Sequence, residues 1–402
     1  MGLFQQPVKP LLPLQGITVV SLEQAVAAPF TTRQLADLGA RVIKIERPQV
    51  GDFARGYDKT VLGQSSHFVW LNRSKESFTL DVKHPAAKEV LDRLLSRVDV
   101  FVQNLVPGAA LRLGLSSEAL LASYPRIIVC NISGYGPDGP YSQKKAYDLL
   151  IQCESGVMSV TGTAETPSKA GISVADIAAG MYGYTGILTG LYQRERTGKG
   201  TAFDVSMFEA LGEWMGYPAY FTSYGGAPPA RTGAAHATIH PYGPFPAGDG
   251  KSVFFGVQNE REWADFCAVV LGQSDLATDP RFSNNSQRDA HRQELTDIIV
   301  GAFSRFTAAE VVERLEQAQI ANARLNTMQE FWKHEQLKAR NRWREIDTPN
   351  GSIKALLPPV TMEGVEPRMG AIPSVGQHTR AILGELGFDD NFIARLARKN
   401  AI

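Results

Sequence analysis

The apolar residues in the first half of the chain follow two alternating periods. Short β-branched runs, typical of buried strands, are separated by stretches in which apolar residues recur every three or four positions, as on one face of a helix. This pattern predicts strands over 17–22, 41–46, 99–103 and 126–133, and helices over 29–38 and 85–98. Because such alternation is typical of a parallel sheet covered by helices, we predict an α/β fold with a Rossmann-like large domain.

A long helix is predicted over 177–196, and it contains four glycines at positions 180, 183, 186 and 190. Each glycine inside a helix costs about 1 kcal/mol relative to alanine, so their presence needs a compensating reason. Small residues spaced three and four apart let a second backbone approach closely. We therefore expect this helix to pack tightly against another helix. A further helix is predicted over 205–220.

The remaining chain suggests a second domain and a returning tail. A Gly/Pro-rich segment over 224–233 reads as a loop or linker. It is followed by a predicted strand over 252–257, helices over 260–271, 288–303 and 308–318, and a last helix near 378–386. We predict a large domain beginning with residues 1–222, a smaller α+β domain over 223–330, and a C-terminal segment, 331–402, that returns to the large domain.

Composition excludes several classes of protein. The chain of 402 residues is 44% hydrophobic and 20% charged, as in an ordinary globular enzyme, and Lys+Arg and Asp+Glu both count 41. This balance provides no overall field for nucleic acid or an anionic membrane. No run approaches the roughly 20 apolar residues of a membrane span, and the proline-bearing N-terminus lacks a signal layout. Three scattered cysteines (Cys130, Cys153 and Cys267) favour a reducing setting, so we expect the cytoplasm.

Two motifs match the spacing of known binding sites, but the residues around them argue against such sites. Gly134–Gly139 matches G-x-G-x-x-G after a strand, but Pro137 and Pro140 remove amide donors that a dinucleotide would need. His236 and His240 have the spacing of a helical metal pair, yet Pro241 prevents helix continuation. We therefore expect no nicotinamide, flavin or metal site.

Asp176 is the most informative acidic residue, because it stands where an apolar stretch meets the glycine-rich helix. One interpretation is a simple helix cap, a common role for aspartate. The other is a nucleophile, since the positive end of a helix dipole keeps a carboxylate ionised and an ionised, positioned carboxylate can attack an acyl group. Spacing alone leaves both open.

Motifs along the whole chain resemble those of one family. In order they are PLQGITVVSLEQAVAAPF, VIKIERPQVGDFARG, NRSKESFTLDVKHP, VDVFVQNLVPGAALRLGL, ISGYGPDGP, AYDLLIQ, ADIAAGMYG, RTGKGTAFDVSMFEA, PYGPF and PSVGQHTRAILGELG. This set is similar to the class III (family III) coenzyme A transferases, the family of formyl-CoA transferase and the α-methylacyl-CoA racemases. The resemblance implies an interlocked homodimer that acts on acyl-CoA and a short carboxylic acid, with coenzyme A thioesters as substrates and no separate cofactor.

The resemblance also assigns roles to residues. It implies that Asp176 is the catalytic aspartate that becomes acylated, with Asp148 as a second acidic position beside it. By position, the residues expected to contact coenzyme A are Arg47, Lys83, Asn104, Arg112 and Lys145. Its phosphates would need such cations and donors.

Departures from formyl-CoA transferase narrow the substrate. The active-site loop, Gln24–Pro29, has the apolar Val26 where that enzyme has glutamine, and Tyr57 replaces a tryptophan. These differences argue against oxalate and formate. The loop RTGAAHATIHPYGPF resembles that of members acting on C4–C5 dicarboxylates, so we expect succinyl-CoA as donor and an itaconate-, mesaconate- or citramalate-type acceptor. The expected partners of its second carboxylate are Arg55, Arg231, His236 and His240.

Three alternatives stay open from the sequence. A racemase of this family uses a histidine where this chain has Tyr147, and a phenol is a poor base at neutral pH. An intramolecular transfer between the two carboxyls of one mesaconate would use the same chemistry as intermolecular transfer. A silent CoA-binding protein would have no need of both Asp148 and Asp176.

Overall fold

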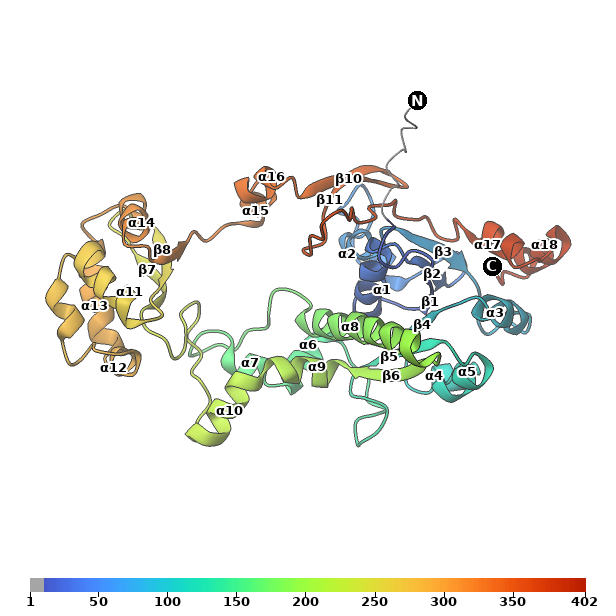
Figure 1. Cartoon of the computed structure of the whole chain (residues 1–402), viewed down its shortest axis with the longest axis horizontal. Coiled ribbons are helices and arrows are strands. Elements are labelled where there is room, and N and C mark those ends of the chain that lie inside the picture. Colours follow the sequence, from blue (N-terminus) through green and yellow to red (C-terminus); the bar gives the residue numbers. More distant parts are fainter. Residues whose placement is uncertain (1–10) are drawn as a thin grey trace, which may run out of the picture. The chain divides into compact units, whose positions relative to one another are not determined.

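The predicted alternation of strands and helices builds a six-stranded parallel sheet in the order β3-β2-β1-β4-β5-β6 (Figure 1). The structure is a computed structural model and describes residues 11–402. Most of the N-terminal segment that was predicted to lack a signal peptide lies outside the described residues. The strands are β1 (Thr18–Leu22), β2 (Arg41–Glu46), β3 (Lys75–Thr79), β4 (Val100–Gln103), β5 (Ile128–Ser133) and β6 (Thr201–Ser206).

The sheet belongs to the first of two compact units. Of the described residues, unit 1 contains 11–155, then Gly171–Met215 and Leu337–Ile402. Its helices are α1 (Ala27–Asp37), η1 (Phe53–Gly56), α2 (Ser66–Leu71), α3 (Ala87–Leu95), α4 (Ala109–Arg112), α5 (Ser117–Ser123), α6 (Asp148–Glu154), α8 (Val174–Thr197), α9 (Met207–Trp214), α17 (Thr379–Glu385) and α18 (Asp390–Arg398). A hairpin of β10 (Trp343–Thr348) and β11 (Gly351–Leu356) also belongs to it.

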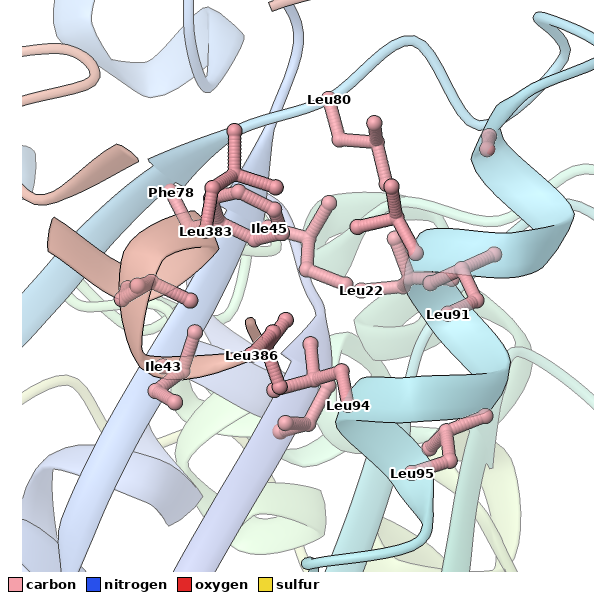
Figure 2. Packing of buried hydrophobic residues seen from close by; sticks show 14 of the residues in the cluster. Leu22, Ile43, Ile45, Phe78, Leu80, Leu91, Leu94, Leu95, Leu383 and Leu386 are labelled. Atoms are coloured by element: carbon pink, nitrogen blue, oxygen red, sulfur yellow. The ribbon is translucent and has the colours of Figure 1, made fainter. Parts of the chain in front are cut away.

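One face of the sheet is buried under helices from both ends of unit 1. Alternate residues of the strands, such as Val20, Ile43 and Ile45, pack with leucines of α3 and α17 in one apolar cluster that also includes side chains of α5 and α18 (Figure 2). Figure 2 shows Leu383 of α17 beside Ile45, and Leu386, which directly follows α17, beside Leu94 of α3. The burial of these apolar side chains is the main force that holds the chain end to the sheet.

The opposite face carries α1 and α8, and the glycines of α8 determine how closely they approach. A Cβ on Gly180 would stand 2.8 Å from the carbonyl oxygen of Ala27, and one on Gly183 would stand 2.8 Å from Thr31 Oγ1 of α1. Gly186 and Gly190 instead face Phe203 of β6 and Ile128 of β5. The predicted tight helix–helix packing is thus confirmed for the first two glycines, whereas the other two let the helix lie close to the sheet.

Unit 2 contains Gly156–Ala170 and Gly216–Gln336 and has its own core. A three-stranded antiparallel sheet, β7 (Tyr242–Pro246), β8 (Ser252–Gly256) and β9 (Ala321–Ala323), packs with aromatic residues such as Trp263 and Phe282. Its helices are α7 (Val157–Val160), α10 (Gly216–Gly225), α11 (Glu260–Asp265), η2 (Phe266–Leu271), η3 (Ser274–Thr278), α12 (Asn285–Ala290), α13 (Arg292–Phe303), α14 (Ala308–Gln317) and α15 (Met328–Trp332); α16 (Glu335–Ala339) spans the return to unit 1.

Two strands of the large sheet escaped the sequence prediction. The segment 205–220, predicted as one helix, begins inside β6 and continues as α9 and α10. β3 (KESFT) was not predicted, because Lys75, Ser77 and Thr79 are buried beside a single apolar residue, Phe78. Both strands lie at the edges of the sheet, where pairing with one neighbour and local polar partners decide the structure more than apolar patterning does. Within residues 11–402 no helix combines the length and apolar character needed to cross a membrane.

Candidate active site

The strand order reverses direction beside β1, and this reversal creates the place where ligands of parallel sheets usually bind. β2 lies on one side of β1 and β4 on the other, so the connections after β1 and β4 diverge at the carboxyl edge. Asn104, which follows β4, joins the two connections: its Oδ1 accepts from the Gln24 N–H at 2.9 Å and its Nδ2 donates to the Gln24 carbonyl at 2.9 Å. Asn104 was expected to contact coenzyme A, and here its side-chain amide holds the loop after β1.

The other four residues expected at coenzyme A follow carboxyl ends of strands in unit 1. Arg47 follows β2, Lys83 follows β3, Arg112 lies in α4 after β4, and Lys145 lies after β5. All four are exposed. In a parallel sheet the carboxyl ends lie along one edge, so the topology brings these cations to the same side as Gln24.

Asp176 lies in the first turn of α8, three residues after Ser173, the residue that precedes the helix. Asp148, the first residue of α6, caps this turn instead: its Oδ1 accepts from the backbone N–H groups of Ala175 at 2.8 Å and Asp176 at 3.3 Å. Gln152 Nε2 donates to the other oxygen of Asp148 at 2.6 Å. The capping role considered for Asp176 therefore belongs to Asp148, and the Asp176 carboxylate is left for another purpose.

The surroundings of Asp176 make its carboxylate unusually basic. Burial and, next, the neighbouring Asp148 charge raise the pKa of Asp176 from 3.8 to about 7, whereas the backbone N–H of Ala27 favours the ionised form and acts against them. Under the nucleophile interpretation, the helix dipole was expected to keep this group ionised. Burial and the second carboxylate outweigh the dipole, since its partial charge is modest and both other effects act at close range.

Two further residues of unit 1, Ala27 and Tyr57, interact with Asp176. Ala27 begins α1, and its amide is the hydrogen-bond donor that faces the carboxylate. Burial raises the pKa of Tyr57 to about 12, with additional effects of the charges of Asp52 and Asp176. Tyr57 therefore stays protonated and can donate a hydrogen bond. Its side chain is shielded on one side, with 48% of its surface exposed, and makes an edge contact with His67.

Two other predicted site residues are held within the protein in unit 1. Val26 is only 4% exposed and precedes α1. The Arg55 guanidinium forms a bidentate salt bridge with Glu46, with N–O distances of 2.9 and 2.8 Å. Its third nitrogen donates to the Pro373 carbonyl at 3.1 Å. This geometry indicates that Arg55 orders the connection after β2.

The loop of unit 2 that was expected to bind a second carboxylate contains two residues with structural partners. The Arg231 guanidinium donates to the carbonyls of Thr163 at 2.9 Å and Ala164 at 2.7 Å, and so clamps a neighbouring loop. His240 is 3% exposed, and burial, followed by the charge of Arg292, lowers its pKa to about 4. A neutral, enclosed imidazole is a poor partner for a carboxylate.

His236 differs from these residues, because it lines a cavity of about 270 Å³ together with Thr161, Tyr217 and Thr232. Its Nδ1 accepts from the N–H groups of Thr238 at 3.2 Å and Ile239 at 3.0 Å. Nδ1 is therefore unprotonated in this arrangement, and the ring proton resides on Nε2 as a donor. The ring stacks on Tyr242 at a centroid distance of 5.4 Å, which holds its orientation.

Sequence reasoning missed the backbone donor at Ala27 and a set of buried charges behind it. An amide has no residue signature, so no pattern could have revealed the first. The second had a signal in Lys44, a lysine at an inward position of the apolar run RVIKIE. A fully buried lysine needs a carboxylate partner nearby.

A family model described as CoA-transferase family III matches residues 14–379. The chain belongs to this family. The family III protein named succinyl-CoA:glutarate CoA-transferase from Mus musculus is 33% identical over 393 residues, 96% of this chain and 89% of that protein. The acetyl-CoA:oxalate CoA-transferase of Acetobacter aceti is 36% identical over 337 residues, covering 83% of this chain and 86% of that one.

A solved structure supports the family III fold. The crystal structure of a CAIB/BAIF family protein from Brucella suis matches with a TM-score of 0.81 at 31% identity, covering 94% of this chain and all (100%) of that chain. The predicted fold class is thereby confirmed at the level of an α/β protein with a large parallel sheet and a smaller antiparallel sheet.

The raised pKa of Asp176 predicts a pH-dependent stability change for the Asp176→Asn variant. The folded protein holds this proton more tightly than the unfolded chain does, so the wild type loses stability as pH rises from about 4 through about 7. Each unit of pKa is worth about 1.4 kcal/mol, and the partial exposure of the side chain reduces the total to about 2 kcal/mol. We expect the variant to be more stable than the wild type by that amount at pH 8 and equal to it near pH 4, measured by urea denaturation. The exposed Asp297→Asn variant is the control, and a difference that does not change with pH would contradict the prediction.

Proposed function

We propose that this family III enzyme transfers coenzyme A from an acyl-CoA to a dicarboxylic acid, with Asp176 as the covalent nucleophile. Assignment of the chain to the family supports the reaction class. The two relatives described above are named for transfer to glutarate and to oxalate, and both acids are dicarboxylates. The single observation that carries the mechanism is the partly buried Asp176 carboxylate, which faces the Ala27 amide and has a pKa near 7.

The first half-reaction moves coenzyme A onto the enzyme. The Asp176 carboxylate attacks the thioester carbonyl of the donor, the C–S bond breaks, and a mixed anhydride and the coenzyme A thiolate form. The thiolate then attacks the aspartyl carbonyl of this anhydride. The donor acid leaves as a carboxylate, and Asp176 carries coenzyme A as a thioester.

The second half-reaction reverses these steps with the acceptor. The acceptor carboxylate attacks the aspartyl thioester and expels the thiolate, which gives a second mixed anhydride. The thiolate attacks the acceptor carbonyl of that anhydride, so the product acyl-CoA forms and the Asp176 carboxylate is restored. Each step exchanges one acyl bond for another of similar energy.

The surroundings of Asp176 suit it both as the attacking carboxylate and, once acylated, as the carbonyl that the thiolate attacks. A carboxylate whose pKa is about 7 is more nucleophilic than an ordinary one, yet a substantial fraction is ionised at neutral pH. During attack on the aspartyl carbonyl, negative charge develops on an oxygen that the Ala27 N–H can stabilise.

Removing the nucleophile tests the mechanism. We expect Asp176→Asn to lower the rate of CoA transfer by about 10³-fold or more, since an amide cannot form the anhydride. With donor acyl-CoA present, hydroxylamine should convert Asp176 of the wild type to a hydroxamate, detectable by mass spectrometry, and should leave the variant unmodified. Asp297→Asn is the matched control and should retain wild-type transfer. Normal transfer by Asp176→Asn, or no trapped adduct in the wild type, would refute covalent catalysis at this residue.

For the acid, we propose a C5 dicarboxylate, unsaturated or branched, with succinyl-CoA as donor. A second carboxylate needs a fixed donor, and His236 offers its Nε2–H from a stacked and hydrogen-bonded ring. Arg55, Arg231 and His240 are engaged by other groups of the protein, so His236 remains the residue of the expected set with a free donor position.

A panel of acids tests this assignment. With succinyl-CoA as donor, we expect kcat/KM for C5 dicarboxylates to exceed that for monocarboxylates and oxalate by about tenfold or more. In His236→Asn the amide oxygen can replace Nδ1 as acceptor while the Nε2 donor is lost, so KM for the dicarboxylate should rise about tenfold and monocarboxylate turnover should not change. His334→Asn, an exposed histidine of unit 2, is the control. A tenfold preference for oxalate, a monocarboxylate or an aromatic acid would overturn the acid assignment.

We also propose an interlocked homodimer. The exposed aromatic side chains of α10, among them Tyr217, Tyr220 and Tyr224, form apolar surface of the kind that a second chain covers. Chains that thread through each other cannot separate without unfolding. Sedimentation equilibrium at micromolar concentration should therefore find only dimer, and a reversible monomer would exclude interlocking.

A further inference from the structure

Behind the loop that joins β1 to α1, four buried side chains alternate in charge. Lys75 Nζ lies 2.7 Å from Glu23 Oε1, the same oxygen lies 3.4 Å from Lys44 Nζ, and Lys44 Nζ lies 2.7 Å from Asp52 Oδ2. All four side chains have 0% exposure. We call this set the buried charge chain.

Fold stability alone does not account for the buried charge chain. Removing charges from water is costly, and the attraction between partners offsets this cost only when their geometry is excellent. Well-packed apolar residues of the same volume often stabilise a core equally well or better. The contacts of its members with the neighbouring backbone offer another reason for the presence of these charges.

The members of the chain hold the loop and the first turns of α1. Asp52 Oδ1 accepts from the Ala25 N–H at 3.2 Å, and Lys75 Nζ donates to the Pro29 carbonyl at 3.0 Å. Thr32 Oγ1 of α1 donates to Glu23 Oε2 at 2.6 Å. Every one of these contacts joins the buried charge chain to residues within seven positions of Ala27.

Ala25 has a backbone conformation that its residue type disfavours, so contacts with the surroundings must hold this loop in place. Its φ of +62° lies in the left-handed region, which an alanine adopts only when the surroundings require it. Two residues later, the Ala27 N–H faces the Asp176 carboxylate. The direction of that N–H therefore depends on the backbone turn at Ala25.

We propose that Lys44, Asp52, Glu23 and Lys75 are positioning residues that hold Ala25 in its left-handed turn and thereby aim the Ala27 N–H at Asp176. They touch neither substrate nor the reacting carboxylate, and act through the loop. This inference rests on the proposed role of Asp176 as nucleophile. It adds a source for the orientation of the donor that stabilises charge on that residue.

The titration of Asp176 should report the position of the loop. The charged or titratable groups that face its carboxylate are Asp148 of α6 and Tyr57 after η1, and the Ala27 N–H of α1 is the donor among its neighbours. A displaced loop would withdraw the donor, disfavour the carboxylate and raise the pKa of Asp176. The acid limb of the pH–rate profile, where Asp176 loses its charge, would then move to higher pH.

The test replaces the Lys44–Asp52 pair by the neutral pair Lys44→Met/Asp52→Asn. The double variant removes one positive and one negative charge, so net charge is unchanged and no buried ion is left without a partner. We expect kcat to fall about 10–100-fold, with KM for the acyl-CoA within about twofold, because the loss of an oriented donor acts on the charged intermediate. The acid limb should move up by about one pH unit. Hydrogen exchange of peptides covering 23–31 should speed up at least about tenfold as the loop opens.

If the double variant does not fold, the single variant Asp52→Asn provides the test. Removal of one negative charge can by itself only lower the pKa of Asp176. Displacement of the loop would raise it. An acid limb that moves to higher pH in Asp52→Asn therefore supports positioning, and one that stays or moves to lower pH overturns it.

A second buried ion pair in unit 1 provides the matched control. Arg73 forks onto Asp37, the last residue of α1, with both N–O distances at 2.7 Å. Arg73→Met/Asp37→Asn removes one positive and one negative buried charge at the far end of the same helix. Arg33, whose Nη1 lies 3.1 Å from Asp37 Oδ2, keeps the amide oxygen of the new side chain as an acceptor. We expect a similar loss of thermal stability, with kcat, the pH profile and exchange of 23–31 unchanged.

The outcomes separate this inference from the proposed function. If wild-type enzyme transfers no coenzyme A, or Asp176→Asn transfers it normally, the proposed function fails. If Asp176→Asn is inactive but Lys44→Met/Asp52→Asn keeps the wild-type kcat and pH profile, the positioning role fails. Hydrogen exchange of peptides covering 23–31 is measured without substrate. If the double variant exchanges as slowly as the wild type, the positioning role is excluded, whatever the activity.

Discussion

The close approach of α8 to α1 determines the geometry of the candidate site. Gly180 lies four residues after Asp176 on α8, and a Cβ there would stand 2.8 Å from the carbonyl oxygen of Ala27. Thr31 of α1 also donates to the Gly180 carbonyl at 2.9 Å, which fixes the register of the two helices. Residues four apart share a helix face, so the contact that places Gly180 against Ala27 also directs Asp176 toward the start of α1. Any larger residue at this seam would move the carboxylate away from its donor.

The two acidic residues of the site have different environments and therefore different capacities. Asp148 receives two backbone N–H groups and the Gln152 amide, an arrangement that satisfies a charged carboxylate. Asp176 has one such donor and is partly buried beside a like charge, so its pKa rises to about 7. Neighbouring carboxylates with separated environments are a common way for enzymes to assign different roles to chemically identical groups.

Strands β2 and β3 carry buried charged side chains close to the candidate site, and each of these has a polar partner. Lys44 and Lys75 occupy inward positions on the α1 face, and their ammonium groups find carboxylates or carbonyl oxygens at hydrogen-bonding distance. The opposite face of the same strands is apolar and packs under α3 and α17. The sheet therefore has one face that provides stability through burial and another that organises backbone through charge.

The periodicity of the sequence was sufficient to predict β1, β2, β4 and β5 and the class of fold, because buried strands and amphipathic helices are local patterns. Motifs spread over the chain were sufficient to indicate the family and to select Asp148 and Asp176. β3 and β6 were beyond this reasoning, since the buried positions of β3 are mostly polar and most positions of β6 are half-buried or exposed at the edge of the sheet. The roles of Arg55, Arg231 and His240 were also decided by tertiary structure: a guanidinium or imidazole is available to a ligand only if the fold brings it no closer partner. The Ala27 amide and the raised pKa of Asp176 arise from the packing of α1 against α8, and such through-space effects have no counterpart in the linear order of residues.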